Sequence, residues 1–172
     1  MGGFKIIGQK QLSGSVQPQG AKNEALQIIS ATLLTKEKII IQNIPLITDV
    51  ICLMNILKGL GVVIKKMKSH AYSFEAKNIN LEYLKSIEFK QDSRNIRGSV
   101  MIIGPLLARF GKAIMYFPGG DKIGRRRLDT HFIGLSKLGA KFKLINDEFY
   151  KISAEKLTGN YILLEEASVT GT

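Results

Sequence analysis

The sequence predicts an α/β fold built from a repeated β-α-β-α-β-β unit. Three observations lead to this prediction: similar landmarks recur at a near-constant spacing, short β-branched runs alternate with helical periodicities, and one helical segment in each repeat is apolar nearly all round. A helix without a polar face is normally buried inside a domain rather than lying on its surface. We therefore expect each unit to hide one helix and expose the other.

Four pairs of landmarks define the repeat, and they follow the same order along the chain. They are Leu33-Leu34 with Leu106-Leu107 and Pro45 with Pro118, both 73 positions apart, Leu60-Gly61 with Leu138-Gly139, 78 apart, and Leu12-Ser13-Gly14 with Leu157-Thr158-Gly159, 145 apart. The last spacing is close to two periods. The landmarks predict repeat 1 over about 11–80, repeat 2 over about 84–156 and the start of repeat 3 over 157–172.

Local patterns predict the elements of the first unit in order. Asn23 is a candidate N-cap for the buried helix, Thr48 for the amphipathic one, and Gly61 marks where the amphipathic helix stops. The expected elements are a strand over 11–17, a buried helix over 24–34, a strand over 38–42, an amphipathic helix over 48–60, and hairpin strands over 62–67 and 71–76.

The second unit repeats this order, with a closing hairpin around Asn146-Asp147. Its predicted elements are a buried helix over 96–110, a strand over 113–117, an amphipathic helix over 128–138, and hairpin strands over 140–144 and 149–153. A third unit begins at Leu157 with a strand over 161–164, so the chain ends where a third buried helix is expected.

Composition excludes several classes of protein. The 172 residues include 25 Lys and Arg against 14 Asp and Glu, a formal net charge of +11 that favours anionic partners such as nucleic acid, membrane phosphates or small phosphorylated substrates. The single cysteine, Cys52, excludes an internal disulfide and is expected to pack in the core. No apolar run reaches the ~18–20 residues that span a bilayer, and no secretory signal begins the chain, so a cytoplasmic setting is expected.

The sequence contains no cluster of His, Cys and carboxylate residues at metal-ligand spacing. It also contains no Walker loop and no dinucleotide-binding fingerprint. We therefore expect neither a metal ion nor a cofactor.

The turn Gly20-Ala21-Lys22-Asn23 is the first candidate site. It lies where a strand gives way to a helix, so backbone N–H groups and the helix dipole attract an anion there. Lys22 adds a compact positive charge suited to a phosphate or carboxylate. The alternative is an ordinary solvated lysine, with Asn23 acting only as a helix cap.

The loop Pro118-Gly119-Gly120-Asp121-Lys122-Ile123-Gly124, followed by Arg125, Arg126 and Arg127, is the second candidate site. Its three glycines let the backbone approach a ligand closely. A carboxyl group among bound anions keeps its proton more readily, which suits Asp121 to donate one. The alternatives are an Asp-initiated turn neutralised by the arginines, and an RNA-contacting patch formed by the arginines themselves.

Arg97 begins the second buried helix, and its head group is expected to face a cleft. Asp129 and His131 follow the arginines at the entry to the next helix. His131 is a candidate ligand contact, although a capping or surface histidine is the more common outcome.

The turn at Gly20, the stretch Gly104-Pro105-Leu106-Leu107-Ala108-Arg109-Phe110-Gly111 and the segment from Pro118 to His131 together resemble the UDP-N-acetylglucosamine 1-carboxyvinyltransferases, which are enolpyruvyl transferases. The resemblance covers essentially the whole chain, in order. It implies a fold of two inside-out α/β barrels, each of three β-α-β-α-β-β units with buried helices. Residues 11–172 would then form an incomplete barrel, and the first strand, within 1–10, would belong to a second barrel that is missing after Thr172.

The resemblance implies transfer of the enolpyruvyl group of phosphoenolpyruvate to the 3-hydroxyl of UDP-N-acetylglucosamine, a step of bacterial peptidoglycan synthesis. Lys22 and Asn23 would bind phosphoenolpyruvate, with Lys22 balancing its charge, and Asp121 would be the proton donor. Arg126 would contact the phosphate, since fixed cations suit anionic substrates. The UDP-sugar would contact Arg97, Arg126, Arg127, Leu128, Asp129, Thr130, His131, Glu166, Ala167, Ser168 and Val169.

Three positions depart from the family pattern. Asp121 stands where many members have cysteine, Glu166 stands where a lysine is often found, and Arg127 replaces a common proline, which leaves that backbone less rigid.

Two alternatives to this function remain: a transferase like 5-enolpyruvylshikimate-3-phosphate synthase, and a basic RNA-binding module. With the leading interpretation we expect no nucleic-acid or membrane partner, and a chain that is inactive and marginally stable without the second barrel.

Overall fold

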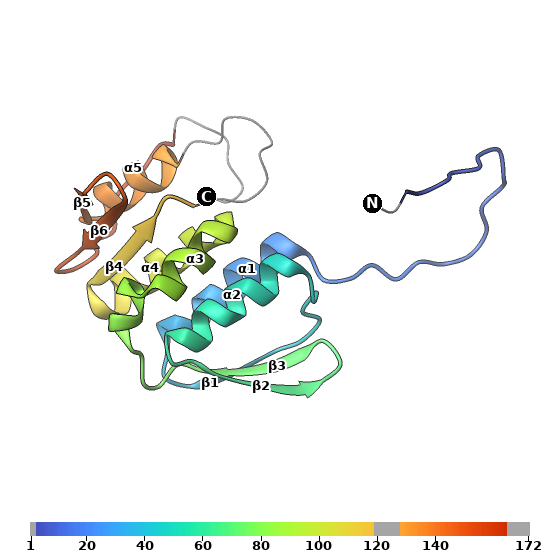
Figure 1. Cartoon of the computed structure of the whole chain (residues 1–172), viewed down its shortest axis with the longest axis horizontal. Helices are drawn as coiled ribbons and strands as arrows, with labels where there is room; N and C mark the ends of the chain where they lie inside the picture. Colours follow the sequence, from blue (N-terminus) through green and yellow to red (C-terminus); the bar gives the residue numbers. More distant parts are fainter. Residues whose placement is uncertain (1–2, 119–127, 165–172) are drawn as a thin grey trace.

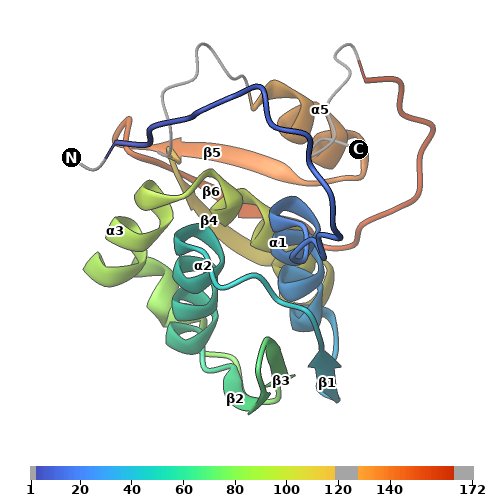
Figure 2. The same cartoon turned by 90° about the vertical axis from the view of Figure 1, so that its right-hand side faces the viewer.

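Two three-stranded antiparallel sheets lie on opposite sides of a group of helices (Figures 1 and 2). The computed structural model describes residues 3–118 and 128–164. In chain order the elements are α1 (Lys22–Ala31), the 3₁₀ helix η1 (Thr32–Leu34), β1 (Lys38–Ile41), α2 (Thr48–Gly59), β2 (Val63–Lys68), β3 (Ala71–Glu75), η2 (Leu81–Lys85), α3 (Ile87–Asn95), η3 (Arg97–Ile102), α4 (Ile103–Phe110), β4 (Lys112–Tyr116), α5 (Asp129–Lys137), β5 (Lys141–Ile145) and β6 (Phe149–Ser153).

The two sheets are built in the same way. Their strand orders are β1-β3-β2 and β4-β6-β5, so the last strand of each unit lies in the middle. In both sheets the last residue of the central strand lies opposite the first residue of each outer strand: Glu75 opposite Lys38 and Val63, and Ser153 opposite Lys112 and Lys141. Corresponding residues are therefore 74 or 78 positions apart, which agrees with the spacing of the sequence landmarks.

The six predicted strands of these sheets and the amphipathic helix of each unit are confirmed, with ends that differ by at most one residue. Residues that tolerate the left-handed region form the hairpin turns, with φ of 56° at His70, 48° at Asn146 and 53° at Asp147. Gly61 and Gly139, with φ of 93° and 107°, end α2 and α5 as expected of glycine beyond a helix C-terminus.

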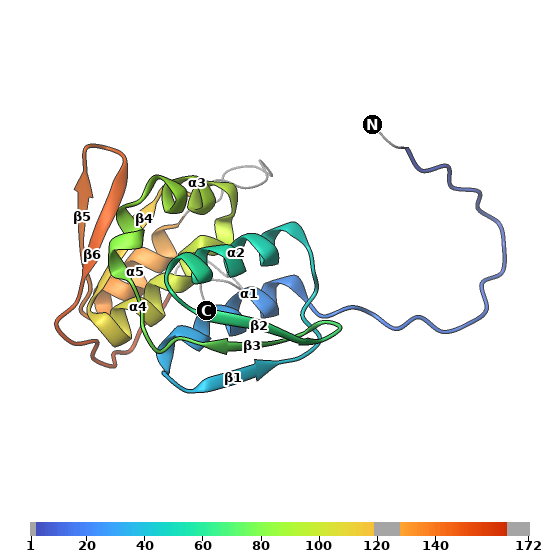
Figure 3. The same ribbon diagram turned by 60° about the horizontal axis from the view of Figure 1, so that its bottom comes forward.

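The predicted opening strands are wrong for the described residues. Residues 11–17 and 161–164 form no strand, and residues 3–20 extend away from the helices without a strand partner (Figure 3). In the second unit, η2 and α3 occupy the place expected for a strand. Ser86 starts α3 because its hydroxyl accepts a hydrogen bond from the Phe89 N–H at 3.1 Å.

Both predicted side-chain caps are also wrong. Helix α1 already begins at Lys22, so Asn23 lies inside it, and α2 begins at Thr48. The extended residues at the N-cap positions are Ala21 and Ile47, neither of which has a side chain that can accept a hydrogen bond.

The apolar helix predicted over 96–110 has the expected extent but two kinds of turn. Its first part is the 3₁₀ helix η3, and α-helical geometry begins at Ile103. Pro105 accounts for the change because a proline has no N–H to donate and is accommodated in the first turn of an α-helix, not its interior.

The core is continuous across the two units. The fully buried side chains Ile29 of α1, Leu53 of α2, Ile102 of η3 and Leu106 of α4 belong to one cluster. Although we expected an exposed helix, α2 buries five residues because it packs between α1 and α3, whereas Thr130 is the one buried residue that α5 contributes. This core cluster holds the first turns of α1 and α2 in fixed positions relative to each other.

Gly61 provides a direct test of the backbone geometry. An added Cβ at this position would lie 2.5 Å from the Asn78 carbonyl oxygen, and its φ of 93° is unfavourable for any residue with a side chain. We expect Gly61→Ala to lower the free energy of unfolding by about 2–4 kcal/mol, measured by urea denaturation. Gly104→Ala is the matched control: the space around its Cβ is open, so the free energy of unfolding should stay unchanged or rise by up to about 1 kcal/mol. Equal losses for both variants would contradict this explanation.

Candidate functional site

Lys22 is the first residue of α1, at the end of the molecule where α1 and α2 both begin. The two helices run side by side in Figure 1. The Lys22 Nζ atom lies 2.9 Å from Oδ2 of Asp49, the second residue of α2, and both side chains are partly exposed. Lys22 and the backbone N–H groups of the two adjacent helix N-termini favour an anion there, whereas the carboxylates of Glu24 and Asp49 in the same first turns oppose it.

The first position of the Gly20-Ala21-Lys22-Asn23 turn requires a glycine. An ideal Cβ at Gly20 would lie 2.0 Å from the backbone oxygen of Asn43, a contact that no side chain tolerates. The chain therefore passes directly against the loop between β1 and α2 before α1 begins. This contact sets the position of Lys22 relative to that loop. Asn23 follows on the same turn and is exposed.

Arg97 and His131 lie close enough for the charge of Arg97 to act on the imidazole ring. Arg97 begins η3, and His131 lies half-buried in the first turn of α5. Burial lowers the pKa of His131, and the positive charge of Arg97 lowers it further. Both effects favour the neutral form of the imidazole ring, in which one ring nitrogen can accept a hydrogen bond.

The remaining described candidates immediately precede His131 in the chain. Leu128 precedes α5 and packs against the core, Asp129 is the first residue of the helix, and Thr130 is buried. A cavity of about 430 Å³ adjoins Thr130 and His131; it is lined by Val100, Met101, Gly104, Thr130, His131, Gly134, Leu135, Leu138, Ile162 and Leu164.

Close packing links this region to Lys22. Helix η3 lies against α1, and an added Cβ at Gly98 would lie 3.0 Å from Cδ1 of Leu26. Gly98 therefore contacts α1 at Leu26, one turn beyond Lys22, and Arg97 immediately precedes Gly98. The structure thus brings the first turns of α1, η3 and α2 to one region.

Seven other site residues predicted from the sequence lie outside the described part of the chain. They are Asp121, Arg126, Arg127, Glu166, Ala167, Ser168 and Val169.

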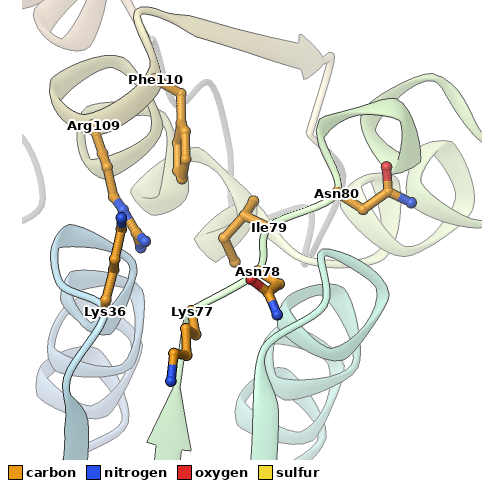
Figure 4. Close-up of a pocket in the computed structure, with 7 residues that line it drawn as sticks. All are labelled: Lys36, Lys77, Asn78, Ile79, Asn80, Arg109 and Phe110. Carbon is orange, nitrogen blue, oxygen red and sulfur yellow. The ribbon is translucent and has the colours of Figure 1, made fainter.

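A second hollow, of about 630 Å³, lies at the other end of α1 (Figure 4). Its lining carries three cations and no carboxylate: Lys36, Lys77, Asn78, Ile79, Asn80, Arg109 and Phe110. Arg109 has a structural role, because its Nη1 donates hydrogen bonds to the carbonyl oxygens of Leu33 at 2.9 Å and Thr35 at 3.1 Å. It therefore satisfies carbonyl groups at the end of η1 that lack helical partners.

Cys52 is not an active nucleophile in this structure. Its thiol lies 3.6 Å from the backbone oxygen of Asp92, and burial, together with the charges of Asp92 and Asp49, raises its pKa to about 11. The thiol therefore stays protonated at neutral pH, in agreement with a packing role.

Within residues 3–118 and 128–164, no group of three or more His, Cys, Asp or Glu side chains could hold a metal ion. The described helices are also too short or too polar to cross a membrane.

Comparison with known proteins identifies the family. A sequence profile of the family described as EPSP synthase (3-phosphoshikimate 1-carboxyvinyltransferase) matches residues 6–172. The chain belongs to this family. An enolpyruvyl transferase of known structure, NikO from Streptomyces tendae, superposes with a TM-score of 0.62 at 19% identity, covering 86% of this chain and 31% of that one. The chain therefore shares the fold of part of an enolpyruvyl transferase, with two small sheets and the helices between them.

Curated relatives narrow the resemblance within the family. Proteins named UDP-N-acetylglucosamine 1-carboxyvinyltransferase are 54% identical in Bacteroides thetaiotaomicron, 56% in Bacteroides fragilis and 51% in Porphyromonas gingivalis. Each alignment covers all of this chain and 40% of the relative. The resemblance inferred from the glycine-containing motifs is confirmed, and this family member spans about two fifths of the length of these relatives.

The lowered pKa of His131 predicts a specific pH dependence of stability. The unfolded chain binds a proton on His131 more readily than the folded chain does. The free energy of unfolding is therefore highest above the ordinary histidine pKa of 6.5 and decreases as the pH falls below it. Replacing His131 with Gln removes this dependence. We expect the free energy of unfolding, measured in urea at about pH 7.5 and about pH 5, to fall less in His131→Gln than in the unsubstituted chain. An equal fall in the variant and in the unsubstituted chain would contradict the lowered pKa of His131.

Proposed function

We propose that the polypeptide carrying this chain transfers the enolpyruvyl group of phosphoenolpyruvate to the 3-hydroxyl of UDP-N-acetylglucosamine and releases phosphate. The identity of 51–56% over the whole chain to transferases of that name carries this proposal. The same observation favours it over a function like that of 5-enolpyruvylshikimate-3-phosphate synthase, and over an RNA-binding module. We place the reaction in peptidoglycan synthesis in the cytoplasm, with no nucleic-acid or membrane partner.

The geometry around Lys22 supports the anion-binding part of this proposal. Lys22 and Asn23 are exposed at the start of α1, where the helix dipole and free N–H groups add to the lysine charge. Lys22 balances the negative charge of phosphoenolpyruvate and of the departing phosphate. A charge held in place before the reaction stabilises the transition state without reorganisation.

Asp121 is the proposed proton donor. A proton adds to the methylene carbon of phosphoenolpyruvate, and the sugar hydroxyl loses its proton as its oxygen attacks the adjacent carbon. The resulting tetrahedral intermediate then loses phosphate and a proton from the new methyl group, which restores the carbon–carbon double bond of the enolpyruvyl group. Arg126 contacts the phosphate, and the UDP-sugar contacts Arg97 and His131 with their neighbours, as given above.

The finer architecture is also a proposal. Residues 11–172 form part of one inside-out barrel, and residues 1–10 supply a strand to a second barrel that completes the site. Exposed apolar side chains support this arrangement, because Phe4, Ile6 and Ile7 lie at 71–100% exposure in a segment with no strand partner. Large apolar side chains in such a cluster usually mark a contact surface.

Phosphate release with both substrates tests the function. The complete polypeptide that carries this chain should release phosphate only when phosphoenolpyruvate and UDP-N-acetylglucosamine are both present, while the 172 residues alone should release none. Lys22→Met should reduce kcat/KM by about 10²-fold or more, because it removes a fixed charge at the reacting phosphate. Full activity of Lys22→Met would contradict the proposed role, and phosphate release by the 172-residue chain would contradict the two-barrel site.

The epoxide fosfomycin alkylates the cysteine that many family members have at this position. Because this protein has Asp121 there, we expect it to resist covalent inactivation by fosfomycin. A carboxylate is a weaker trap for the epoxide than a thiolate is. We expect mass spectrometry to find no adduct on the unsubstituted protein and a covalent adduct on Asp121→Cys. Rapid labelling at Asp121, or no labelling of Asp121→Cys, would show the explanation to be wrong.

A further inference from the structure

Asp49 is the counter-charge of Lys22, and neither the sequence patterns nor the family resemblance gave it a role. The Lys22 Nζ atom lies 2.9 Å from Asp49 Oδ2, although the two residues are 27 positions apart. They come from different helices, so the contact exists only because α1 and α2 pack together.

The position of Lys22 is electrostatically unfavourable for the helix that carries it. A cation at the N-terminus of a helix opposes the helix dipole, whereas an acidic residue there is stabilising. Asp49 lies in the first turn of α2 and offsets both the dipole of its own helix and the charge of Lys22. An exposed ion pair contributes only about 0–1 kcal/mol to folding, so stability alone gives little reason for the arrangement.

The two backbones beneath the pair are firmly held. Ala25 and Leu26 of α1, and Val50 and Leu53 of α2, are buried within one turn of the pair. Asp49 has a short side chain on this rigid support, whereas Lys22 has four flexible methylene groups. A hydrogen bond from Nζ to Asp49 therefore restricts where the ammonium group lies, and it leaves two of the three N–H donors for a ligand.

We propose that Asp49 is a positioning residue, which holds the Lys22 ammonium group at the joint N-terminus of α1 and α2 for binding of phosphoenolpyruvate. This inference rests on the proposed function of Lys22. Asp49 acts through Lys22 and does not itself contact the substrate. Its negative charge repels an anion weakly at this exposed site, and the restriction of the lysine outweighs that repulsion.

A double-mutant cycle on the complete polypeptide tests the inference. Asp49→Asn should raise the KM for phosphoenolpyruvate, and its dissociation constant by calorimetry, by about tenfold. Asp49→Glu, which keeps a carboxylate, should recover part of the loss. In a Lys22→Met background, Asp49→Asn should change the phosphoenolpyruvate dissociation constant no further, because the residue it orients is absent.

Glu24→Gln is the matched control. Glu24 is the acidic residue in the first turn of α1, so this variant removes the same charge from the neighbouring helix N-terminus, and no ion pair joins Glu24 to another described residue. We expect its KM to stay within about twofold of the unsubstituted protein. In urea denaturation, the free energies of unfolding of Asp49→Asn and Glu24→Gln should lie within about 1 kcal/mol of that of the unsubstituted protein. Unfolding then does not explain a change in binding.

Three results would overturn the inference: tighter phosphoenolpyruvate binding by Asp49→Asn, an effect no larger than that of Glu24→Gln, or an undiminished effect in the Lys22→Met background. Failure of the proposed function looks different. In that case the unsubstituted polypeptide would release no phosphate from the two substrates, whereas the calorimetric cycle would still report whether Asp49 acts through Lys22.

Discussion

The packing of α1 against α2 and η3 is the contact on which the candidate site depends. Fully buried side chains such as Ile29 and Leu53 each contribute about 1.5–3 kcal/mol through loss of contact with water. Their burial brings the two helix N-termini together and places Lys22 beside Asp49. Two glycines permit the approach, since Gly20 lies against the backbone of Asn43 and Gly98 against Leu26. The site is therefore built on rigid helices, which suits the binding of a small charged substrate.

Part of the high positive charge of the chain serves the fold. Arg109 satisfies carbonyl groups at the end of η1, and Lys90 of α3 pairs with Glu148 in the turn before β6. The hydrogen bond from Lys90, followed by the charges of Lys90 and Arg94, lowers the pKa of Glu148. These contacts join segments that are far apart in sequence, so they need not mark a binding surface. A net charge of +11 is therefore a weaker argument for nucleic-acid binding than its size suggests.

Sequence patterns predicted most of the regular elements and missed those that depend on a partner. The strands of both sheets and the helix α2 follow from β-branched runs, apolar periodicity and the glycines that end them. Helix α3 was missed because it is largely polar; Phe89, its main apolar anchor, packs between Tyr83 and Tyr116 at ring separations of 5.7 and 5.9 Å. The strand expected over 11–17 is absent because an extended segment becomes a strand only when another strand satisfies its N–H and C=O groups.

The sequence by itself determined the six strands of the two sheets, the helices α2 and α5, the spacing between corresponding strands and the identity of the residues in the Gly20 motif. These properties are local, or depend on residue types at fixed spacing, and can be read along the chain. Only the tertiary structure decided that α2 is buried between α1 and α3, that Arg97 lies near His131, and that Lys22 is paired with Asp49. Such contacts depend on which helix faces meet, and that is settled by how the side chains fill the shared core.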